Sequence, residues 1–304
     1  MSKWLTDVSP TDRAVDVAAR SIAIRLDEVR RFLKRSVKRP GVSENVHQLR
    51  VWTRRADAAL SLYEDLLPPK RLARMRQTLK RVRRAAGRIR DCDVYAERIA
   101  GVNGHWPISL RIERMTAQRK LVDLFEKLDC GRELQKRSRK LIDRLHGRNK
   151  RSRETYLERA HSTLQSLVPS FFESSPGETS GDEQLHQFRI VGKNLRYAME
   201  LLSGAFPAGF RDELYPELAA LQEKLGTIND LSVGQNRLGE QIEQTRDPGV
   251  LSQLSRDSSA TSEELERARQ DFRASWTPLA AKQLRSRFEE FSVVSQVGVP
   301  ASAG

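Results

Sequence analysis

Cysteine and aromatic residues are scarce in this 304-residue sequence. It has two cysteines, Cys92 and Cys130, and aromatic residues make up 6% of the chain. Two cysteines exclude both a framework of several disulfides and a four-cysteine zinc site. So few aromatic side chains disfavour the stacking platforms with which many proteins bind single-stranded nucleic acids.

Long apolar runs are absent as well. No stretch approaches the roughly 18 apolar residues that indicate a membrane-spanning helix, so we expect no contact with a membrane. Residues 1–10 lack the basic region followed by an apolar stretch that marks a signal peptide. These absences predict a soluble protein of a reducing compartment, the cytoplasm.

Positive charge is abundant and unevenly distributed. The chain carries 54 Lys and Arg against 40 Asp and Glu, a formal net charge of +14. Residues 1–150 hold 37 basic and 18 acidic side chains, whereas residues 151–304 hold 17 and 22. This asymmetry favours a polyanionic partner that meets mainly the first half, but a solvated, salt-bridged helical surface explains the charge equally well.

Apolar residues recur at spacings of three and four, and no segment shows the alternation of a strand. Glycine and proline divide this pattern into long helices, the first three over about 11–38, 43–67 and 70–100. Ser180 with Glu183 forms a capping-box pattern before the helix that carries His186. The sequence therefore predicts an all-α fold.

Two pairs of segments recur with a single offset. The stretch 46–51 matches 185–190, and the stretch 86–91 matches 225–230, both 139 residues further on. Two separate matches at one offset predict two homologous halves. We expect each half to form an antiparallel four-helix bundle, the two bundles being related by a pseudo-two-fold axis.

The repeat also sets the expected domain organisation. Residues 11–148 form the first bundle and residues 149–290 the second. Residues 1–10 and 291–304 are expected to be flexible ends. The stretch from Val293 to Gly304 consists of small, uncharged residues and contains glycine and proline.

Basic side chains gather on one face of the helix that begins near residue 43. Because successive helical residues rotate by about 100°, His47, Arg50 and Arg54 share a face opposite the apolar one. The second half repeats this arrangement with His186, Arg189, Lys193 and Arg196.

The helix over 70–100 carries a second basic stripe beside its apolar face. The stripe consists of Arg76, Lys80, Arg83, Gly87 and Arg90. Cations beside a packed seam are costly unless carboxylates or a bound anion neutralise them, and no carboxylate occurs within the stripe. Gly87 and Gly226 each cost about 1 kcal/mol inside a helix, which indicates close approach of either a neighbouring helix or a phosphate chain.

Signals of catalysis and of metal binding are missing. None of the five histidines is paired with another at a spacing of three or four, so no metal site is expected. There is no glycine-rich phosphate loop and no nucleophile elbow. We expect a protein that is not an enzyme and needs no cofactor.

The paired motifs resemble a known family. His-x-x-Arg-x-x-x-Arg-Arg at 47–55, with Gly-x-x-x-Asp at 87–91, is similar to the CHAD family, the conserved histidine α-helical domain. Companion patterns lie at 185–200 and 225–230, and the resemblance covers roughly 11–290. It implies one CHAD domain made of two helical bundles, with a basic groove or pore that binds inorganic polyphosphate without catalysis.

The resemblance assigns polyphosphate binding to basic side chains of both halves. In the first half these are His47, Arg50, Arg54, Arg55, Lys80, Arg83 and Arg90. In the second half they are His186, Arg189, Lys193, Arg196 and Lys224. Asp91 and Asp230 are expected to orient the cations, with Gly87 and Gly226 as structural support. The resemblance also implies location at polyphosphate granules and polyphosphate-metabolising enzymes as partners.

Two other functions stay open. Arginine-rich helices bind duplex backbones without sequence specificity, and a surface with Arg71, Arg74, Arg81 and Arg84 could hold nucleic acid weakly. A phosphohistidine phosphotransfer protein is the other alternative, although the arginines around both matched histidines suit holding phosphate better than transferring it.

Overall fold

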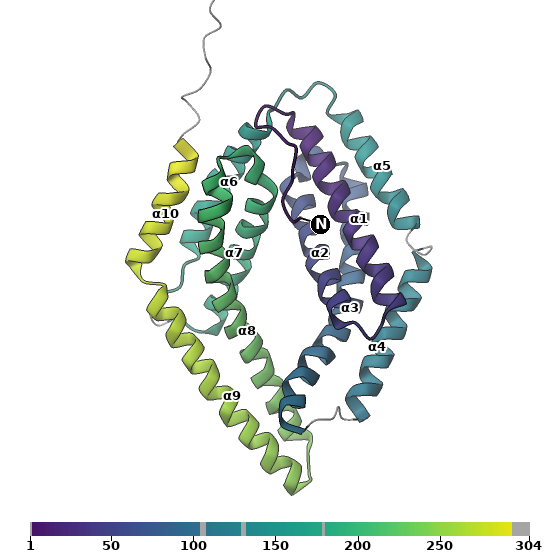
Figure 1. Ribbon diagram of the computed structural model, residues 1–304, viewed down its shortest axis with the longest axis vertical. Helices are drawn as coiled ribbons and strands as arrows, with labels where there is room; N and C mark the ends of the chain where they lie inside the picture. Colours follow the sequence, from purple (N-terminus) through teal and green to yellow (C-terminus); the bar gives the residue numbers. More distant parts are fainter. Residues whose placement is uncertain (1, 104–107, 129–131, 178–179, 294–304) are drawn as a thin grey trace, which may run out of the picture. The chain divides into compact units, whose positions relative to one another are not determined.

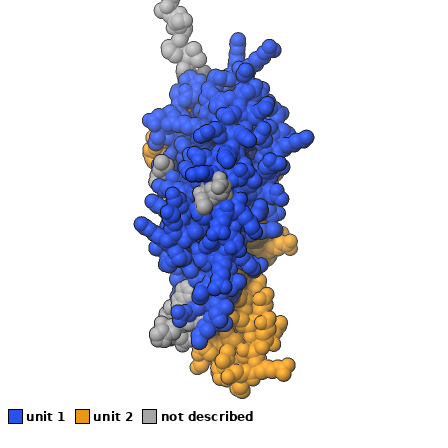
Figure 2. Space-filling model, turned by 90° about the vertical axis from the view of Figure 1, so that its right-hand side faces the viewer, with its two compact units in different colours: residues 1–159 blue, residues 160–304 orange. Residues whose placement is uncertain are grey.

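The computed structural model describes residues 2–103, 108–128, 132–177 and 180–293. This part of the chain has helices and no strand (Figure 1). An isolated β-bridge joins Arg13 to Thr155. The all-α prediction is therefore confirmed. The chain divides into two compact units, residues 1–159 and 160–304, which Figure 2 colours separately.

The first unit is built from long helices that pack pairwise. These are α1 (Ala14–Lys38), α2 (Ser43–Leu62), the 3-10 turn η1 (Glu64–Leu66), α3 (Pro69–Asn103), α4 (Ile108–Lys127) and α5 (Arg132–Arg148). α1 packs against α2 and α5, and α3 packs against both α2 and α4. α3 therefore has one side towards α2 and another towards α4.

The predicted helix breaks and the apolar stripe explain where the helices of this unit end and which face of α1 is buried. α1 ends before Pro40 and Gly41, and α3 begins at the proline pair 68–69. Along α1, the stripe of Ile22, Leu26, Val29 and Leu33 is buried against its neighbours.

The N-terminal segment, which we expected to be flexible, contacts α1 over its described residues. Leu5 is buried. Arg20 Nη1 donates a hydrogen bond to the carbonyl oxygen of Asp7 at 2.7 Å, and Arg25 Nη2 donates to that of Lys3 at 3.3 Å. These contacts tie the segment to the first unit.

The second unit is also built from helices. Its elements are α6 (Tyr156–Glu173), whose first residues belong to the first unit, α7 (Asp182–Leu202), the 3-10 turn η3 (Ser203–Ala205), the π-turn η4 (Phe210–Leu214), α8 (Tyr215–Gln244), α9 (Pro248–Ser275) and α10 (Pro278–Val293). Aromatic rings fill its core: Phe188 lies 4.8 Å from Phe171 and 5.3 Å from Trp276, measured between ring centroids.

The predicted capping box before α7 is wrong. The N-cap of α7 is Gly181, and no side chain caps this end. Ser180 therefore lies one residue too early to cap the helix. A side-chain cap does occur at α9, where Asp247 Oδ1 accepts hydrogen bonds from the amides of Gly249 and Val250.

Several predictions about the ends and boundaries stay predictions. The repeat boundary at 148/149 and the pseudo-two-fold relation are untested. Residues 294–304 of the expected C-terminal tail, like Cys130, lie outside the described residues, whereas residues 291–293 belong to α10. No helix in the described ranges is both long and apolar enough to cross a membrane.

Candidate functional site

Arg50 joins α2 to α3 in the first unit. Its Nη1 donates hydrogen bonds to the carbonyl oxygen of Gly87 at 3.0 Å and to Asp91 Oδ1 at 3.2 Å. A Cβ at Gly87 would lie 3.2 Å from Arg50 Nη1, closer than most real Cβ contacts. The glycine thus lets a guanidinium lie against the backbone of α3. The two interpretations of Gly87, close approach of a helix or of a phosphate chain, stay predictions; the neighbour that the structure shows is the Arg50 side chain.

One histidine and two arginines, His47, Arg54 and Arg90, lie close enough to Arg50 to interact with its charge. Burial lowers the pKa of His47 below its usual value; Glu44 opposes this, and the charges of Arg90, Arg50 and Arg54 lower the pKa further. Burial also lowers the pKa of Arg50; Asp91 opposes this shift, and Arg54 and Arg90 add to it. We call His47, Arg50, Arg54 and Arg90 the Arg50 cluster. The positive charges gathered in this cluster create a positive potential, which favours the binding of an anion.

Carboxylates from outside the α3 stripe neutralise much of it. The ion pairs are Arg76–Glu64 at 2.7 Å, Arg83–Asp57 at 3.2 Å and Arg90–Glu97 at 3.3 Å. Asp57 belongs to α2 and Glu64 to η1, whereas Glu97 lies about two turns further along α3. The lack of carboxylates within the stripe therefore does not by itself require a bound anion, which corrects that step of the sequence argument.

Arg54 and Lys80 form no ion pair with any residue that the structure describes. Arg54 is half-buried beside Arg50, and Lys80 is exposed. The guanidinium of Arg55 lies over the ring of Trp52, 4.9 Å from its centroid. Arg54 is thus the cation of the cluster with the least internal compensation.

In the second unit, the matched histidine contacts α8. His186 Nδ1 lies 3.1 Å from Asn229 Oδ1, and Asn229 Nδ2 donates to Asp230 Oδ1 at 3.1 Å. At the 139-residue offset, Asn229 corresponds to Arg90. The second unit therefore has a neutral amide where the first has a cation. Arg189 and Lys193 lie half-buried on α7.

Arg196 is engaged inside the second unit. Its Nη1 donates to Glu200 Oε1 at 3.2 Å and to the hydroxyl of Tyr215 at 2.9 Å, and that hydroxyl donates to Glu200 at 2.7 Å. Glu200 is only 1% exposed. A buried carboxylate needs this compensation, so an anionic ligand would compete with Glu200 for Arg196.

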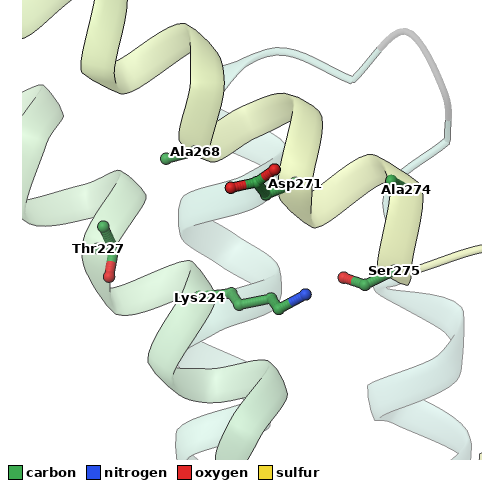
Figure 3. Close-up of a pocket in the computed structure, with 6 residues that line it drawn as sticks. All are labelled: Lys224, Thr227, Ala268, Asp271, Ala274 and Ser275. Carbon is green, nitrogen blue, oxygen red and sulfur yellow. The ribbon is translucent and has the colours of Figure 1, made fainter.

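Lys224 lies apart from these groups, in a pocket of about 410 Å³ between α8 and α9. Its side chain extends towards Ser275 (Figure 3). Asp271 lines the same pocket and reduces its positive potential. At Gly226, a Cβ would meet no atom within 4 Å, unlike at Gly87. The two matched glycines therefore differ in their surroundings.

The counter-ions are what sequence reasoning missed. Asp57 lies three residues after Arg54, a spacing that predicts an ion pair within one helix. Its observed partner, Arg83, lies on α3 instead. Gly192 was also missed: a Cβ there would clash with Gln222 of α8. The described residues contain no group of three His, Cys, Asp or Glu that could hold a metal ion.

These features define an all-α protein with histidine, arginine and lysine clusters at matched positions of α2 and α7. The family model of the CHAD domain matches residues 20–239, more than half of the chain. The chain belongs to the CHAD domain family.

Two solved structures are similar to this chain. The CHAD domain from the plant Ricinus communis is 20% identical, with a TM-score of 0.64, over 95% of this chain and 96% of that one. PptA from Streptomyces chartreusis is 18% identical, with a TM-score of 0.49, over 87% of this chain and 99% of that one. The former likeness supports the fold. A comparison with curated proteins found no match.

Proposed function

We propose that this protein binds inorganic polyphosphate at the Arg50 cluster and does not catalyse a reaction on it. The observation that carries the proposal is the crowding of His47, Arg50, Arg54 and Arg90 where α2 meets α3. Burial lowers the pKa of His47, and the charges of the three arginines lower it further. A linear phosphate chain carries about one negative charge per unit, so successive units can meet successive cations. Membership of the CHAD family supports the same ligand.

Each group of the cluster has a separate task in this proposal. Arg50 is positioned by the backbone of α3, and its planar guanidinium can donate to two phosphate oxygens. Asp91, whose side chain is 65% exposed, orients Arg50 and can be displaced without stranding a buried charge. Arg54 lies one turn further along α2 and meets the next phosphate. His47 gains a proton when phosphate lies beside it.

The second unit contributes less to binding in this proposal. His186, Arg189 and Lys193 present basic groups on α7. Asn229 takes the place of a cation, and Arg196 is held by Glu200. We therefore expect α2 and α3 to supply most of the binding free energy.

The proposal also gives the protein a cellular role. Binding without catalysis would hold the protein on polyphosphate granules in the cytoplasm, or present the chain to a polyphosphate-metabolising enzyme. Incubation with polyphosphate should accordingly leave its chain length unchanged.

Matched variants test the site. Arg50→Gln with Arg54→Gln should weaken the binding of labelled long-chain polyphosphate at least about tenfold, because each lost charged hydrogen bond is worth about 1.5–3 kcal/mol before the flexible ligand readjusts. Arg189→Gln with Lys193→Gln should weaken it less.

The control removes the same charge elsewhere. Arg139 and Arg144 are exposed on α5, and Arg139→Gln with Arg144→Gln should change the affinity less than about twofold at near-physiological salt. If this control weakens binding as much as the Arg50 and Arg54 pair does, net charge rather than the Arg50 cluster determines binding.

A further inference from the structure

A second basic pocket lies between α3 and α4 in the first unit. It has a volume of about 320 Å³ and is lined by Arg81, Arg84, Lys120, Asp123, Leu124 and Lys127. The Arg50 cluster lies where α2 meets α3. The two basic regions thus occupy the two sides of α3 that face different helices, and we call the new one the α3–α4 pocket.

The cations of the α3–α4 pocket lack internal compensation. Arg83 and Arg90 on the same helix each pair with a carboxylate. In contrast, the four basic side chains of the pocket form no ion pair within the described ranges, and Asp123 is the one acidic lining residue. The floor is Leu124, which is 7% exposed. Repulsion between the cations is therefore relieved by solvent or by a ligand.

Packing of the helical hairpin does not require these arginines. At the 139-residue offset, Ala220 and Glu223 of α8 correspond to Arg81 and Arg84, and all four side chains are exposed. The matching position on α8 therefore carries a negative charge or none. The packing of the hairpin therefore does not explain the basic character of the α3–α4 pocket.

We propose that the α3–α4 pocket binds a compact anion of two or three linked phosphate groups, independently of the Arg50 cluster. Arg81 and Arg84 lie about one turn apart and can each grip one phosphate, while Lys120 and Lys127 add point charges from α4. The volume is at the lower end for a small-molecule site. No lining residue is aromatic, so a nucleobase finds no stacking partner here.

Replacing Asp123 should change the affinity in the opposite direction to replacing the basic residues. Its carboxylate repels a bound phosphate, so Asp123→Asn should strengthen binding of a pure phosphate anion, by about threefold for one charge at an exposed site. Arg84→Gln with Lys120→Gln should weaken it about tenfold or more, because two charged contacts are lost. These opposite effects identify the pocket itself.

The experiment is a calorimetric titration of the full-length protein with tripolyphosphate and, separately, with duplex DNA. Every variant carries Arg50→Gln and Arg54→Gln, which removes the contribution of the Arg50 cluster. The matched control is Arg139→Gln with Lys140→Gln, which removes one exposed arginine and one exposed lysine from α5. We expect the control to bind within about twofold of its parent, and far-ultraviolet circular dichroism to be the same for all variants.

Three results would overturn the proposal. The first is that the parent, which carries Arg50→Gln and Arg54→Gln alone, does not bind tripolyphosphate. The second is that the pocket variant (Arg84→Gln with Lys120→Gln) and the control weaken binding equally. The third is that the pocket variant loses binding to duplex DNA rather than to tripolyphosphate. The last result would make this face a nucleic-acid surface. Failure of the Arg50 cluster is seen separately, as unchanged affinity for long-chain polyphosphate when Arg50 and Arg54 alone are replaced.

Discussion

Replacing the two matched glycines by alanine should have different effects on stability. Gly226→Ala should stabilise the fold by about 1 kcal/mol, because alanine is the better helix former and its Cβ meets nothing within 4 Å. Gly87→Ala gains the same propensity but places a Cβ 3.2 Å from Arg50 Nη1, so that the guanidinium has to shift by a few tenths of an ångström against the backbone of α3.

The destabilisation by Gly87→Ala comes from weakening one hydrogen bond, from Arg50 Nη1 to the carbonyl oxygen of residue 87. A charged hydrogen bond contributes about 1.5–3 kcal/mol, and Arg50 keeps its pair with Asp91 while it shifts by a few tenths of an ångström. We take the loss as about 1 kcal/mol, which cancels the helix propensity. Gly87→Ala should therefore be near neutral and lie about 1 kcal/mol below Gly226→Ala.

Urea denaturation followed by circular dichroism measures both changes, each against the wild-type protein, with the transitions of the two units fitted separately. Polyphosphate affinity provides the second readout. It should fall for Gly87→Ala, because Arg50 is displaced, and stay unchanged for Gly226→Ala. The reasoning is refuted if Gly87→Ala stabilises as much as Gly226→Ala and binds polyphosphate as the wild type does.

Three further substitutions follow from the same contacts. Because the pKa of His47 lies below its usual value in the free protein and phosphate raises it, polyphosphate affinity should increase as the pH falls from about 7.5 to 5.5, and His47→Gln should reduce this increase in a binding titration. Glu200→Ala removes the buried partner of Arg196 and should lower the unfolding free energy by about 3 kcal/mol in urea; an unchanged midpoint would show that the carboxylate is dispensable. Asp57→Asn releases Arg83 and should raise polyphosphate affinity by about threefold in the same titration, whereas a decrease would mean that Arg83 acts only when its carboxylate positions it.

The helices could be predicted because their signals are local. Pro40 with Gly41, and the proline pair 68–69, interrupt the apolar periodicity where α1 ends and α3 begins. The start of α7 shows the limit of such signals: Ser180 and Glu183 have the spacing of a capping box, but the chain enters the helix at Asp182.

The charge balance of the candidate site could not be predicted from single helices. A helical wheel places Arg83 and Arg90 on one stripe, but it does not show that Asp57 of α2 reaches Arg83. Such pairs depend on how neighbouring helices pack. The pair Arg196–Glu200 has the i,i+4 spacing and was open to prediction, whereas its third member, Tyr215, comes from α8.

The central claim, polyphosphate binding by a cationic cluster, is tested most directly by competition. Labelled long-chain polyphosphate is bound at fixed near-physiological salt and challenged with unlabelled polyphosphate, duplex DNA, single-stranded RNA, tripolyphosphate and orthophosphate, because polyanion affinities compare only at one salt concentration. We predict that unlabelled long-chain polyphosphate displaces the label more efficiently per charge than DNA, RNA, tripolyphosphate or orthophosphate. If DNA or RNA competes equally well per charge, the protein is a general polyanion binder and the assignment to the Arg50 cluster is contradicted.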